Sequence, residues 1–157
     1  MGMRFSSSFS LNRNFADDFC RYGGGVSFFS QEVKMIQILS VGAGGFIGAV
    51  LRFFMGKLPL KEMTIFPVNT LLINLIGAFA IGLVAAAGSR YGAENSNLVL
   101  FLKVGLCGGF TTFSTFSLES LALIQEGRFL VFMAYAVSSV ALCLLAVWLG
   151  HMAEALI

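Results

Sequence analysis

Four long apolar segments dominate this 157-residue chain. They run from Met35 to Gly56, from about Ile65 to Ala87, from about Leu98 to Ile124, and from Phe129 to Gly150. Each is near or above the ~20 residues that a helix needs to span the hydrocarbon core of a bilayer. The connections between them are short and polar, so four sequential antiparallel helices are the simplest arrangement. The pattern predicts an all-α integral membrane protein with four transmembrane helices.

The composition supports this class and argues against several others. Hydrophobic residues make up 57% of the chain and charged residues 11%, whereas soluble domains carry roughly 25% charged residues. The net charge of +2 and the scattered basic residues give no reason to expect a nucleic-acid partner. The three cysteines are an odd number and two lie in apolar segments, so no disulfide framework is expected. The sequence shows no metal-ligand spacing, catalytic triad or phosphate loop, and an enzyme is not expected.

Residues 1–34 do not follow the four-helix pattern. They are polar and rich in Ser, Phe and Gly, and they lack the continuous apolar region of a signal peptide. One interpretation is a disordered extension. The other is a mis-assigned start, because codons for Gln31-Glu32-Val33 can contain a ribosome-binding sequence just before Met35.

The third segment contains an uncharged run of glycines, hydroxyls and aromatic rings from Gly108 to Ser117. Two adjacent glycines weaken a helix, and the Thr and Ser residues after them can satisfy backbone groups that a break sets free. Non-helical backbone survives at membrane depth only where protein buries it or where it lines a water-filled path. We therefore expect the third helix to be broken near its middle, between Gly108 and Thr112, at a place where ion sites are common.

Phe113, Phe116 and Glu119 are spaced by three, which places them roughly along one face of the third helix. Hydroxyls flank the two rings, at Thr111, Thr112, Ser114 and Thr115. A phenyl ring has a positive edge that can contact an anion without a full charge. The alternative for the rings is lipid-facing or core packing. Glu119 is an intramembrane carboxylate, which favours a function; its alternative is a structural or vestibule role.

Other polar groups occur in the remaining segments. Asn74 lies midway along the second segment, where its amide could donate to an anion or join two helices. Tyr135, Ser139 and Cys143 are spaced by four and form one weakly polar stripe, for which helix–helix hydrogen bonding is the alternative. Arg52 ends the first segment and could reach the membrane surface or attract anions into a vestibule.

Small residues and charge balance suggest further association. Gly44 with Gly48, and Ala78 with Gly82, have the spacing of helix-packing pairs, either within one subunit or between subunits. From Met35 on, basic residues are almost equally divided between the two membrane sides, so the positive-inside rule does not select a topology. Such a chain could insert in both orientations.

The polar residues match a known pattern from Met35 to about Gly150. The matching stretches are Gly108–Ser117 with Glu119, Gly44–Ala49 with Leu51-Arg52, and Asn69-Thr70 with Asn74–Gly77. Together they resemble the signature of the fluoride channels called Fluc or CrcB. Residues 1–34 have no counterpart in that family.

The resemblance implies an antiparallel, dual-topology homodimer with two pores in a bacterial inner membrane, built from a channel domain at residues 35–157. It implies passive export of cytoplasmic fluoride, which lowers fluoride toxicity. The implied fluoride-pore residues are Phe113, Phe116, Asn74, Tyr135, Ser139, Ser114, Thr115, Glu119 and Arg52. Backbone carbonyls of Gly108 and Thr111, from both subunits, would hold a structural sodium ion. Cys143 departs from the family pattern, because this position usually carries a hydroxyl.

Two other functions remain open. A small proton-coupled multidrug exporter is also a four-helix, dual-topology dimer, but its key carboxylate lies in the first helix, whereas here Glu119 lies in the third. A non-transporting assembly subunit would use the hydroxyls only for packing.

Overall fold

The computed structural model describes residues 33–59 and 65–155. Of the stretch 1–34, only residues 33 and 34 belong to the described part, so both interpretations of that extension stay predictions. The described helices belong to one compact unit that begins at Lys34.

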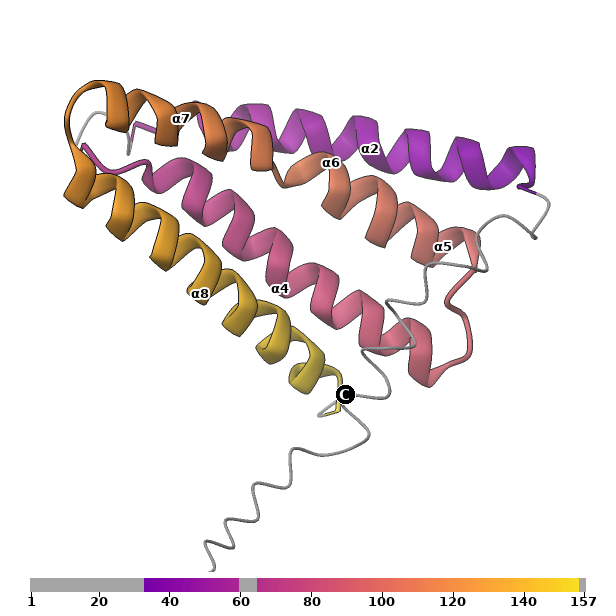
Figure 1. The fold of residues 1–157 in the computed structure, drawn as a ribbon. Helices are drawn as coiled ribbons and strands as arrows, with labels where there is room; N and C mark the ends of the chain where they lie inside the picture. The colour runs from indigo at the N-terminus through magenta and orange to yellow at the C-terminus, as the bar shows by residue number, and fades with distance from the viewer. Residues whose placement is uncertain (1–32, 60–64, 156–157) are drawn as a thin grey trace, which may run out of the picture. The chain divides into compact units, whose positions relative to one another are not determined.

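Four helical spans are long and apolar enough to cross a membrane, as predicted. Three are continuous helices: α2 (Met35–Gly56), α4 (Val68–Arg90) and α8 (Phe129–Glu154). The third span is composite (Figure 1). It consists of α5 (Asn97–Val99), the wide π-helical segment η2 (Leu100–Cys107), α6 (Gly108–Phe110) and α7 (Phe113–Gln125).

The third span is broken, but not at the glycine pair. The extended residues are Thr111, with ψ 159°, and Thr112, with φ −150° and ψ 116°. Gly108 is helical, with φ −64° and ψ −39°. The glycines serve close packing instead, because a Cβ atom at Gly109 would lie 2.5 Å from the carbonyl oxygen of Gly45. The prediction of a break was right, and its attribution to weakened helix at the glycines was wrong.

Two pairs of spans pack closely through glycines: α2 lies along the third span and α8 lies along α4 (Figure 1). Side chains added at Gly44 and Gly48 would collide with the carbonyl oxygens of Phe101 and Leu106 in η2.

In the α4–α8 pair, a side chain at Gly82 would collide with the carbonyl oxygen of Val147, and one at Gly150 with that of Phe79. Glycines at such positions let two backbones approach. Gly44, Gly48 and Gly82 thus pack within one subunit, and contact between subunits through such residues stays a prediction.

Large apolar side chains mostly point away from the rest of the chain. Phe46 is 72% exposed and Leu130 is 87% exposed, and Tyr135 is the one large side chain that is fully buried among the described residues. A soluble protein rarely exposes apolar surface so widely. In a membrane protein this surface contacts lipid tails, which are as apolar as the side chains.

Candidate functional site

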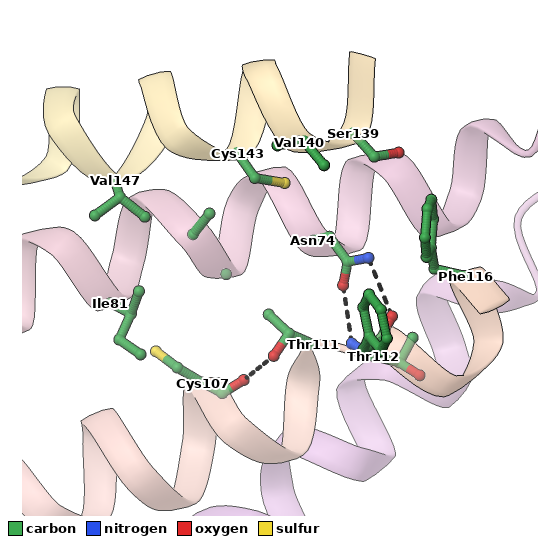
Figure 2. Close-up of a pocket in the computed structure, with 13 residues that line it drawn as sticks. Asn74, Ile81, Cys107, Thr111, Thr112, Phe116, Ser139, Val140, Cys143 and Val147 are labelled. Carbon is green, nitrogen blue, oxygen red and sulfur yellow. Dashed lines mark hydrogen bonds between the residues drawn. The ribbon is translucent and has the colours of Figure 1, made fainter. Parts of the chain in front are cut away.

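The break in the third span is held by one side chain from α4. The backbone N–H of Thr112 donates to Oδ1 of Asn74 at 2.8 Å, and Nδ2 of Asn74 donates to the carbonyl oxygen of Thr112 at 3.1 Å (Figure 2). We call this two-bond arrangement the amide clamp. In an unbroken α-helix the Thr112 N–H would donate to the carbonyl of Gly108. The clamp therefore replaces a lost helical bond and joins two helices, which is one of the two roles expected of Asn74.

The hydroxyls around the break satisfy further backbone groups. The Thr112 hydroxyl oxygen accepts from the backbone N–H of Thr115 at 3.1 Å and so caps the start of α7. It also donates to the Thr115 hydroxyl at 2.9 Å and lies 3.2 Å from the Ser114 hydroxyl. The Thr111 hydroxyl donates back to the carbonyl of Cys107 at 2.9 Å. At the start of α7 a freed backbone N–H thus has a local hydroxyl partner, as the sequence pattern predicted.

Aromatic rings form a row from α7 to α8. The ring centroids of Phe113 and Phe116 are 5.5 Å apart, and those of Phe116 and Tyr135 are 5.0 Å apart. The Tyr135 hydroxyl donates to Oε2 of Glu119 at 2.9 Å. Phe113, Phe116 and Glu119 therefore lie along one face of α7, as predicted, and Tyr135 of α8 packs against that face.

A cavity of about 360 Å³, here called the central groove, lies between α4, the third span and α8. Its lining includes Phe116, Asn74 and Ser139 (Figure 2). Phe113 also lines it. Ser139 is 8% exposed, and in the described part of the chain its hydroxyl has no hydrogen-bond partner. The remaining lining residues are Gly77, Ala78, Ile81, Cys107, Thr111, Thr112, Val140, Cys143 and Val147.

A second cavity of about 530 Å³, here called the vestibule, is more polar and lies where α2 ends and α4 begins. Its charged lining groups are Arg52, Lys57 and Glu119. Its other lining residues are Ala49, Phe53, Gly56, Asn69, Thr70, Ile73, Thr112 and Thr115. Because Thr112 lines both cavities, the clamped break lies between the vestibule and the central groove.

Arg52 also contacts the break directly. Its Nη1 donates to the carbonyl oxygen of Thr111 at 3.4 Å, a long hydrogen bond. The guanidinium thus lies beside the unwound backbone, with two basic groups and one carboxylate around the vestibule. Excess positive charge in a cleft raises the local concentration of anions.

The structure divides the predicted pore residues among three places. Asn74, Phe113, Phe116 and Ser139 line the central groove, and Arg52, Thr115 and Glu119 line the vestibule. Tyr135 is fully buried and lines neither cavity, and Ser114 is exposed and also lines neither.

Two residues outside the predicted pore set also contribute to this region. One is Lys57, which lies just past the end of α2, and a basic residue directly after an apolar segment is the signal that could have found it. Nδ2 of Asn69 donates to the carbonyls of Leu58 at 2.9 Å and Gly56 at 3.3 Å. Asn69 therefore secures the end of α2. No local pattern in the sequence indicates these two hydrogen bonds.

The fold and these two cavities define a class: a membrane protein with four spans, whose third span is broken between two cavities. Residues 39–151 match the family model described as "CrcB-like protein, Camphor Resistance (CrcB)". The chain therefore belongs to the CrcB family.

Curated relatives agree with this assignment. The chain is 46% identical over 120 residues to "Fluoride-specific ion channel FluC" of Ruminiclostridium cellulolyticum, a match that covers 76% of this chain and 92% of that protein. It is 46% identical over 126 residues to the protein of the same name from Paramagnetospirillum magneticum, with 78% and 98% covered. For that of Geobacter sulfurreducens the identity is 42% over 120 residues, with 76% and 97% covered.

Proposed function

We propose that this chain is a fluoride-selective passive ion channel of a bacterial inner membrane that exports cytoplasmic fluoride and so lowers its toxicity. The relatives that it matches over most of their length are named fluoride-specific ion channels. The observation that carries the proposal is the pair of cavities meeting at Thr112. One cavity has basic groups in its wall, and the other has two phenylalanines together with Asn74 and Ser139.

The order of these groups suits a small, strongly hydrated anion. Arg52 and Lys57 draw anions into the vestibule. The hydroxyl of Thr115 then offers a neutral hydrogen bond, and the ring edges of Phe113 and Phe116 offer weak positive charge beyond it. Neutral donors and ring edges hold an anion in several weak steps, which allows it both to enter and to leave.

The proposal includes an antiparallel, dual-topology homodimer. Phe113 is 79% exposed although it lines the central groove, so one chain does not enclose the ring. Four short helices do not shield a pore from lipid on all sides, and a second copy would close the open side. The nearly balanced basic residues are what insertion in two orientations requires.

A structural sodium ion is part of the same proposal. Carbonyl oxygens suit a hard cation, and the amide clamp removes the helical donor from the carbonyl of Gly108, which is an exposed residue. The Thr111 carbonyl accepts one bond from Arg52, and an oxygen with two lone pairs retains one. One chain thus supplies two carbonyls, and a second copy would supply two more around a shared axis.

A proton-coupled multidrug-type exporter is not favoured. No carboxylate lies in α2, and Glu119 in α7 is held by the Tyr135 hydroxyl. The matched relatives are named as channels, not as enzymes or exporters.

Efflux from proteoliposomes tests the proposal. Purified protein in liposomes loaded with fluoride should release it rapidly to a fluoride electrode, while liposomes loaded with chloride release little. Collapse of the proton gradient with a protonophore should leave fluoride release intact. Absence of release, or release that requires a proton gradient, would overturn the channel assignment.

A further inference from the structure

The central groove has a free thiol, that of Cys143, among its lining residues. Cys143 projects from α8 one turn after Ser139, and both line the groove (Figure 2). Cys143 is partly exposed and carries a free thiol, whereas Cys107, the other described cysteine in the lining, is 4% exposed.

A second observation indicates that this part of the groove is shaped for a ligand. Ser139 is more than nine-tenths buried and lines the groove, and its hydroxyl has no hydrogen-bond partner in the described part of the chain. Buried polar atoms without partners are rare in proteins and require an explanation. Cys143 and Ser139 therefore place a soft sulfur and an unsatisfied hydroxyl about one helical turn apart in the same lining.

We propose that Cys143 is a binding site for soft, thiophilic cations, which enter the central groove and block the anion path. The inference deepens the proposed function, since the block rests on fluoride passing through the groove. With a monovalent organomercury cation, the S–H bond breaks, a sulfur–mercury bond forms, and the proton passes to water. Soft sulfur ligands select soft metals over the hard cations that oxygen prefers, and no oxidant or reductant is needed.

The block follows from the volume and position of the groove. A methylmercury group adds two heavy atoms to a space of about 360 Å³ that Phe116 and Asn74 also line. The adduct also places bulk about one helical turn from Ser139, which lines the same groove. The site thus makes this chain sensitive to thiophilic cations in a way that a hydroxyl at the same position does not.

Intact-protein mass and fluoride efflux test the site together. All variants carry Cys20→Ser, so that the two thiols of the third and fourth spans are compared alone. Methylmercury should add one adduct, mapped to Cys143 by peptide analysis, and should slow fluoride efflux about tenfold or more, since conduction needs an open sequence of sites. Excess dithiol should reverse both effects.

Matched variants separate the two thiols. Cys107→Ser should keep the adduct and the block, whereas Cys143→Ser and Cys143→Ala should lose both, each rate being compared with that of the same variant before mercury. Modification of Cys107 in place of Cys143, or an adduct on Cys143 that leaves efflux unchanged, would overturn the inference. If the untreated protein conducts no fluoride, the proposed function fails, and the mass measurement still decides whether Cys143 is the metal site.

Discussion

Replacement of Asn74 by Leu should release the break in the third span. The two side chains are similar in size, but Leu removes both bonds of the amide clamp, at 2.8 Å and 3.1 Å. Thr112 is only 6% exposed, so water does not readily replace the lost partners. Its N–H and C=O groups would both be left unsatisfied at membrane depth.

The size of the effect follows from these two groups. A buried polar group left without its partner costs about 1–3 kcal/mol, although hydrogen bonds measured within membrane proteins average nearer 0.6 kcal/mol. Two groups together therefore give about 1–4 kcal/mol of local destabilisation. Because about 1.4 kcal/mol corresponds to a factor of ten, the Thr112 amide should exchange its hydrogen about five-fold to 1000-fold faster.

Hydrogen–deuterium exchange read by mass spectrometry, in lipid nanodiscs, measures this change in peptides that contain Thr112. Fluoride efflux should fall in the same variant, because the clamped break separates the two cavities. Ile76→Leu is the matched control: it lies on the same helix, is 48% exposed, and should alter neither measurement. If Asn74→Leu left Thr112 exchange at the wild-type rate, the assignment of Asn74 as the residue that holds the break would be refuted.

Three further changes test the packing and the ring row. Gly82→Ala would drive a methyl group into the carbonyl of Val147 and should lower the free energy of unfolding in a detergent titration by about 1–3 kcal/mol; unchanged stability would contradict the close α4–α8 contact. Phe116→Ile keeps apolar bulk but removes the ring edge, so fluoride efflux should slow while the protein stays folded by circular dichroism; undiminished efflux would exclude the ring from the path. Tyr135→Phe removes the donor to Glu119 and should cost about 1–2 kcal/mol of unfolding free energy, a loss that should be absent when Glu119 is already Ala if the bond is the cause.

The spans were largely predictable from the sequence because their signal is local. The first segment was placed at Met35–Gly56, the bounds of α2. The last was expected to stop at Gly150 but α8 continues to Glu154, where Oε1 of Glu154 lies 2.9 Å from Nη1 of Arg90. Apolar content reports the membrane-embedded part of a helix, whereas a polar last turn is held by a partner far away in the sequence.

The details of the break were not predictable, because they depend on a residue far away in the sequence. Glycine propensity pointed to Gly108 and Gly109, but these residues stay helical against α2. The unwinding occurs at Thr111 and Thr112, where an amide 38 positions earlier supplies the bonds that the helix gives up. Residue spacing within one helix carries no information on such a partner, which is why both roles of Asn74 stayed open.

The π-helical segment Leu100–Cys107 has a consequence for how this protein can vary. Gly44 and Gly48 on α2 are four residues apart, yet they face the carbonyls of Phe101 and Leu106, which are five apart. Removing one residue from the wide turn would shift everything after it by about 1.5 Å and about 100°, and the break would no longer meet its amide. Substitutions in this segment are therefore far easier to accommodate than insertions or deletions, so over evolutionary time its length should be held more strictly than its side chains.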